Sequence, residues 1–119
     1  MITLGWSANS GVQATKPPSR RQAATRSRSP HAARLCAINI LAQVTAACGD
    51  LERVAACLRL GGFVACTPEF ADHPKVINGA SDLMVAVLGE AGRHARAAVG
   101  VPSLPFDAAV EVEAMFEVR

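Results

Sequence analysis

Aromatic side chains are scarce in this chain, which has one Trp, four Phe and no Tyr among its 119 residues. Proteins that hold single-stranded nucleic acid stack its bases on aromatic rings, so this composition argues against that class. Half of the residues are nevertheless hydrophobic, which is enough for a core in a single domain of this length. That core must be built mainly from Ala, Val, Leu and Ile.

Cysteines at metal-ligand or redox spacing are lacking too. Cys36, Cys48, Cys57 and Cys66 include no C-x-x-C pair, and no pair of histidines stands nearby at ligand spacing. All four lie among apolar residues, so we expect reduced, buried thiols in preference to a disulfide framework.

Long apolar runs are absent as well. No run approaches the roughly 18–20 residues that a membrane-spanning helix needs. The start of the chain also lacks the pattern of a secretory signal. We therefore expect a cytoplasmic protein.

Acidic residues are missing from residues 1–30, which carry five basic residues, whereas residues 31–119 carry seven basic and ten acidic residues. The first segment is rich in Ser, Arg, Pro, Ala and Thr and shows no period beyond its first few residues, which predicts a disordered basic segment. It could be a transit peptide, a basic arm, or a frameshifted or mis-started N-terminus. We expect the folded domain to occupy residues 31–119.

Hydrophobic periodicity predicts two helices and three strands in that domain. Residues 32–48 form a helix that ends at Gly49. Its apolar stripe is Leu35, Ile38, Leu41 and Val44, widened by Ala37, Ile40 and Cys48. Residues 51–66 alternate as a strand, and residues 75–88 repeat apolar side chains at helical spacing. Residues 95–101 and 109–118 are strands joined by a hairpin-type loop. The order indicates an α+β fold with helices on one face of a mixed sheet.

The last two strands carry the candidate site residues. Arg96 stands beside the small residues Ala98 and Gly100, which leave room for a ligand, and an arginine fork suits a planar carboxylate. If the two strands pair, Glu111 or Glu113 lies across from Arg96 and could hold a water molecule. An ordinary exposed salt bridge is the competing interpretation.

Four further polar residues have simpler interpretations. Asn78 could be a polar residue on a helix surface. His31, His73 and His94 are isolated in the sequence and are expected to be surface or loop residues.

Three stretches resemble the RidA/YjgF family, also called the endoribonuclease L-PSP family, and in particular its chorismate-mutase-like branch. They are "AARLCAINILAQ", "PKVINGASDLMVAVLGEAGRHARAAVGVPSLP" and "AVEVEAMFEV". The resemblance implies a chorismate-mutase-like fold, a homotrimer and clefts between subunits. It also implies hydrolysis of reactive enamines and imines to 2-keto acids and ammonia, without metal or cofactor.

The same resemblance assigns roles to three residues. Arg96 matches the arginine that grips the substrate carboxylate, Glu111 matches the glutamate that positions the attacking water, and Asn78 matches an asparagine of the cleft. Non-catalytic binding of keto or amino acids, and more distantly endoribonuclease activity, remain alternatives.

Two features depart from the family pattern. Ala98 replaces a cysteine, and residues 1–30 contain no recognisable N-terminal β-hairpin. We therefore expect the sheet to lack its first two strands and the activity to be impaired.

Overall fold

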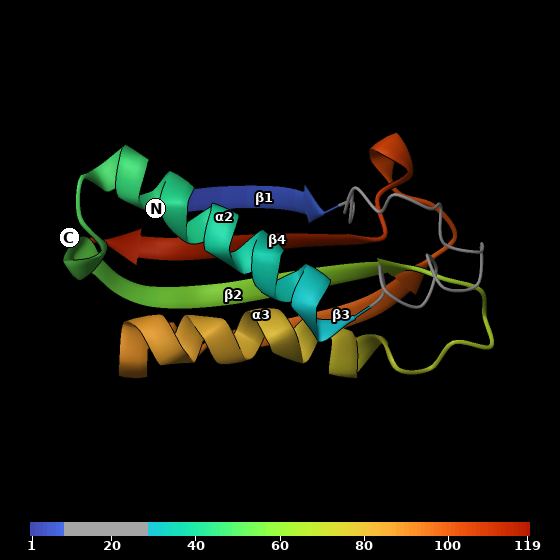
Figure 1. Ribbon diagram of the computed structural model, residues 1–119. Coiled ribbons are helices and arrows are strands. Elements are labelled where there is room, and N and C mark those ends of the chain that lie inside the picture. Colours follow the sequence, from blue (N-terminus) through green and yellow to red (C-terminus); the bar gives the residue numbers. More distant parts are fainter. Residues whose placement is uncertain (9–28) are drawn as a thin grey trace, which may run out of the picture.

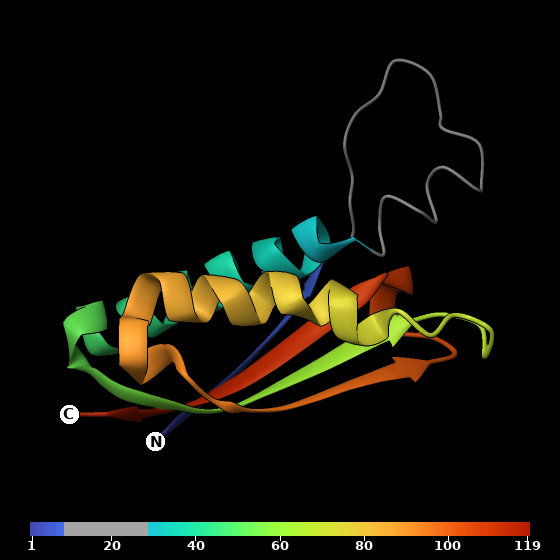
Figure 2. The ribbon, with the colours of Figure 1, turned by 90° about the horizontal axis from the view of Figure 1, so that it is seen from below.

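The computed structural model describes residues 1–8 and 29–119. Within these residues, two α-helices pack on one face of a four-stranded mixed sheet, as Figure 1 and Figure 2 show. The predicted α+β class and the chorismate-mutase-like layering are thus confirmed. The hydrophobic core lies between the helices and the sheet and consists mainly of Ala, Val, Leu and Ile side chains, with Phe116 as a large exception.

Helix α2 (Pro30–Cys48) begins and ends with standard capping residues. Ser29 accepts a hydrogen bond from the Ala32 amide at its start, and Gly49 adopts a φ of 91° at its end, as predicted. The predicted apolar stripe was only partly right, because Leu35 and Ile38 are 38% and 45% exposed. Ala37, Ile40, Leu41 and Val44 are buried as predicted, and the helix also buries Ala32, Ala33 and Cys36. Three of these buried residues are alanines, so the inner face of the helix carries mostly small side chains.

Helix α3 (His73–Leu88) follows the predicted pattern closely. Val76, Ile77, Ala80, Leu83 and Met84 are buried, whereas Val87 near the end is 47% exposed. Proline in the first turn is compatible with helix initiation, and Gly89, with a φ of 61°, ends the helix. A short 3₁₀ turn (Gly89–Gly92) then leads to the next strand.

The sheet has the strand order β1-β4-β2-β3. Strand β1 (Ile2–Ala8) pairs antiparallel with β4 (Val110–Val118) along its whole length. The prediction that residues 1–30 are disordered is therefore wrong for this strand, and the sheet has one strand more than expected. Strand β1 is specified largely by its pairing with β4, so its own residues show little periodicity in the sequence. Residues 9–28 lie outside the described residues, and the domain boundary at residue 30 stays a prediction.

Strand β2 (Val54–Ala65) is the centre of the sheet and pairs with β4 and with β3 (Ala95–Val101). Its pairing with β4 shifts register twice, between Val54 and Ala56 and between Cys57 and Arg59. These irregularities interrupt the predicted alternation, so Cys57 is buried and Leu58 is 38% exposed.

Strands β3 and β4 do not form the hairpin that the sequence predicted. Strand β3 pairs parallel with β2, because the chain crosses over through α3 before it returns to the sheet. The chain then turns at Pro105–Asp107, where Phe106 and Asp107 have φ values of 57° and 54°, and β4 adds to the opposite edge of β2. One whole strand therefore separates the two strands that carry Arg96 and Glu111.

Candidate functional site

Arg96 lies at the start of β3 and reaches toward α3. Its backbone partner in the sheet is Leu60, whose side chain is fully buried in the core. The Arg96 Nη1 donates to Asn78 Oδ1 at 2.5 Å and to Ser81 Oγ at 3.3 Å. Asn78 and Ser81 are three residues apart on α3, so they present neighbouring side chains on one face of the helix. The structure thus brings Arg96 and Asn78 together, as a shared site requires.

His94 extends this cluster. Its Nε2 lies 2.9 Å from Ser81 Oγ, and its Nδ1 lies 2.6 Å from the Gly92 carbonyl oxygen. We had expected His94 to be an isolated surface or loop residue, and Ser81 was not among the predicted site residues. Two features of the sequence could have indicated this cluster. Asn78 and Ser81 are spaced i, i+3, and His94 stands two residues before Arg96.

The charge of Arg96 is not balanced by a described carboxylate. The two ion pairs found among the described residues join Lys75 to Asp72 and Arg93 to Glu90, at 3.3 and 3.1 Å. Arg96 is instead held by two neutral oxygens, in a residue that is exposed to solvent. Neutral partners orient a guanidinium and leave its positive charge available to an anionic group.

Glu111 lies on the other face of the sheet. Buried side chains alternate along β4 at Val110, Val112, Ala114 and Phe116, so Glu111 and Glu113 point away from the helices. Glu111 pairs with Phe63, whereas Arg96 pairs with Leu60, and β2 stands between the two strands. The two backbones are separated by roughly 10 Å along the strands and roughly 10 Å across them.

The expected placement of a glutamate across from Arg96 is therefore wrong within one chain. Glu113 sits over Gly61, where an added Cβ would approach its carboxylate oxygen to 2.8 Å. Neither glutamate reaches the cluster formed by Arg96, Asn78, Ser81 and His94. Any joint action of Arg96 and Glu111 would require two chains.

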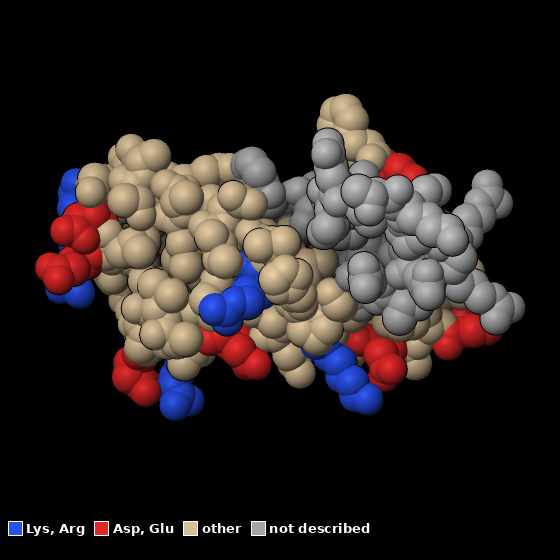
Figure 3. Space-filling model, viewed as in Figure 1, with Lys and Arg blue, Asp and Glu red and all other residues tan. Residues whose placement is uncertain are grey.

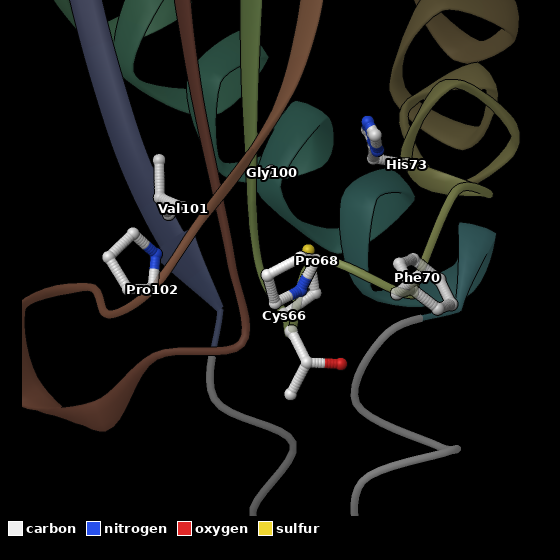
Figure 4. Close-up of a pocket in the computed structure, with 8 residues that line it drawn as sticks. Cys66, Pro68, Phe70, His73, Gly100, Val101 and Pro102 are labelled. Carbon is white, nitrogen blue, oxygen red and sulfur yellow. The ribbon is translucent and has the colours of Figure 1, made fainter.

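A hollow of about 460 Å³ lies further along β3, at the ends of β2 and β3 and the beginning of α3 (Figure 4). Gly100 forms part of its floor, and an added Cβ there would approach the Cys66 thiol to 2.7 Å. Phe70, Pro68, Val101 and Pro102 make its wall mostly apolar. The Nδ1 atom of His73 is buried without a hydrogen-bond partner among the described residues.

The four cysteines and Glu69 lie outside the cluster formed by Arg96, Asn78, Ser81 and His94. Each of the four cysteines, all within the described residues, is a thiol rather than half of a disulfide. Burial raises the pKa of the Cys57 thiol to about 11, against a smaller opposing effect of a hydrogen bond with the Arg59 backbone. Hydrogen bonds to its own backbone and to Thr67 lower the pKa of the exposed Glu69 carboxylate.

No helix among the described residues is both long and apolar enough to span a bilayer. No three of the His, Cys, Asp and Glu side chains there are grouped so that they could hold a metal ion.

The sequence of the chain also matches a known protein family. Residues 21–118 match the family described as "YjgF/chorismate_mutase-like, putative endoribonuclease". The chain belongs to this YjgF/chorismate-mutase-like family, as the sequence motifs indicated.

One individual relative is similar to the chain over most of its length. Protein TCP17 of Trypanosoma cruzi is 53% identical over 89 residues, which are 74% of this chain and 56% of that protein. The chain thus spans little more than half the length of this curated relative.

Two solved structures resemble the chain over nearly its whole length. Atu1372 of Agrobacterium tumefaciens, a protein of unknown function, is 49% identical with a TM-score of 0.80, over 98% of this chain and 74% of that one. A "putative endoribonuclease" of Shewanella oneidensis is 31% identical with a TM-score of 0.73, over 95% of this chain and 68% of that one.

Proposed function

We propose that the protein hydrolyses reactive enamine or imine intermediates of amino acids to 2-keto acids and ammonia. The observation that carries this proposal is the exposed Arg96 guanidinium, which is oriented by Asn78 and Ser81 and has no described carboxylate as a partner. The carboxylate of such a substrate can take two parallel hydrogen bonds from a guanidinium held in this way.

The chemistry needs a water molecule at the imine carbon. Glu111 would accept a proton from this water as its oxygen adds to the C=N carbon, and a proton would pass to the nitrogen. The resulting carbinolamine would release ammonia and leave the C=O group of a 2-keto acid. An enamine would first become an imine by taking a proton at its terminal carbon.

Arg96 and Glu111 would come from different subunits in this proposal. They lie on opposite faces of one sheet and on strands separated by β2. A homotrimer with clefts between subunits, as the family resemblance implies, would let the open sheet face of one chain meet the edge of another. Strand β1 would add to the sheet that frames this cleft.

The test is the decay of an imine that an amino-acid oxidase generates in the assay. We expect the wild-type chain to accelerate the decay and Arg96→Ala to lose at least about tenfold of this acceleration, since positioning by the carboxylate would be lost. Arg93→Ala is the matched control, because Arg93 is an exposed arginine paired with Glu90. Equal rates for wild type and Arg96→Ala would contradict the proposal.

A second candidate is non-catalytic binding of keto or amino acids. The separation of Arg96 and Glu111 within one chain favours it, because binding requires Arg96 alone. A carboxylate ligand would then raise the melting temperature of the wild type, but not of Arg96→Ala, without any imine turnover.

Endoribonuclease activity, which the names of the family and of the Shewanella oneidensis protein mention, has weaker support. Residues 31–119 carry more acidic than basic residues. On the face seen in Figure 3, the basic side chains stand singly or beside acidic ones and form no continuous patch among the described residues. Nucleic-acid binding depends on grouped positive charge.

A further inference from the structure

The ring of a neutral His94 can make its hydrogen bonds with Gly92 and Ser81 in only one arrangement. The Gly92 carbonyl oxygen, 2.6 Å from Nδ1, can only accept a hydrogen bond. The Nδ1 atom must therefore carry the proton. The Nε2 atom of the neutral ring is then an acceptor.

Ser81 continues this chain of hydrogen bonds. Its hydroxyl lies 2.9 Å from His94 Nε2, so it donates to that nitrogen. The Ser81 oxygen then turns its lone pairs away from His94 and can accept from Arg96 Nη1 at 3.3 Å. The whole chain runs from Arg96 through Ser81 and His94 to the Gly92 carbonyl.

We infer that Ser81 and His94 are positioning residues that hold the Arg96 guanidinium for a carboxylate ligand. The inference rests on the proposed function, in which Arg96 binds the substrate carboxylate. Asn78 is exposed, so its side chain alone would hold Arg96 loosely, whereas Ser81 and His94 are half-buried and anchored to the backbone at Gly92. In this arrangement both side chains are uncharged, so they orient the guanidinium without competing with the ligand for its charge.

Nitrogen NMR of the free protein tests the chain of hydrogen bonds without any ligand. The His94 ring should show a protonated Nδ1 and an unprotonated Nε2. Ser81→Ala should shift the Nε2 signal and broaden or move the side-chain signals of Arg96. The opposite tautomer, or unchanged His94 and Arg96 signals in Ser81→Ala, would overturn the inference.

Calorimetric titration with a small 2-keto acid tests the consequence for binding. Ser81→Ala and His94→Phe should each weaken binding about three- to tenfold, the effect of losing one hydrogen bond. Ser81→Thr, which keeps the hydroxyl, should restore most of the affinity, and Ser103→Ala serves as a matched control at an exposed loop position. Wild-type affinity in both Ser81→Ala and His94→Phe would also overturn the inference.

The two proposals fail in distinguishable ways. A wild-type chain that neither binds keto acids nor hydrolyses imines contradicts the proposed function. The NMR signals of His94 and Arg96 would still decide whether Ser81 and His94 hold the guanidinium. Melting temperatures of all variants must stay near that of the wild type for the affinities to be compared.

Discussion

Gly79 shows at the scale of one residue how a missing side chain sets the distance between two helices. It lies inside α3, where an alanine would normally be favoured over glycine by about 1 kcal/mol. An added Cβ would collide with the carbonyl group of Pro30 at the beginning of α2. The two helices approach each other closely here, and the buried face of α2 includes three alanines and Cys36.

Gly79→Ala should therefore destabilise the protein, contrary to helix propensity. We expect the free energy of unfolding to fall by roughly 1–2 kcal/mol, because the cost of overpacking exceeds the gain in propensity. Asp82→Ala, at an exposed position of the same helix, should change it by less than about 0.5 kcal/mol. Chemical denaturation of both variants provides the comparison, and a stabilised Gly79→Ala would show that the helices can separate at no cost.

Helix α2 shows at the scale of the element where a sequence pattern and the packed structure diverge. Apolar residues recur around much of this helix, so periodicity alone could not decide which of them face the sheet. The structure buries Ile40 completely and leaves Ile38 45% exposed. Much of the buried face consists of Ala32, Ala33 and Ala37, and alanines carry almost no weight in a hydrophobic pattern.

Two isoleucine-to-alanine substitutions in α2 test which side of the predicted stripe is buried. Ile40→Ala should lower the free energy of unfolding by roughly 2–5 kcal/mol, because it leaves a cavity in the core. Ile38→Ala should cost less than about 1 kcal/mol, because its side chain already contacts solvent. Similar losses in the two variants would show that Ile38 is packed in the core as well.

Features of the fold that depend on local sequence could be predicted, whereas those that depend on distant contacts could not. The residue range of β3, most of α3 and the end of α2 at Gly49 follow from local patterns and capping residues. The pairing of β1 and the insertion of β2 between β3 and β4 depend on contacts between residues distant in the sequence. Arg96 was predicted from its small neighbours and from the family motifs, and the role of Asn78 from the motifs alone. The hydrogen bonds of Ser81 and His94 depend on how α3 is placed against β3.

The whole molecule is asymmetric, because the described helices cover only one face of the sheet (Figure 2). The uncovered face carries Glu111, Glu113 and Val99, and Val99 is 43% exposed on the edge strand β3. An exposed edge and an uncovered face are features that proteins commonly bury against another chain. The proposed intersubunit cleft uses this same surface.

Val99→Lys should consequently disrupt a trimer, because it places a charge on the uncovered face at the sheet edge. Val87→Lys is the matched control, since Val87 is similarly exposed, at 47%, but lies on α3. Light scattering behind a sizing column should give a trimer mass for the wild type and Val87→Lys and a smaller mass for Val99→Lys. A monomeric wild type would contradict the trimer and the cleft between subunits together. A trimeric Val99→Lys would place the interface on another surface, and Glu111 would then have no route to the carboxylate site of a neighbouring chain.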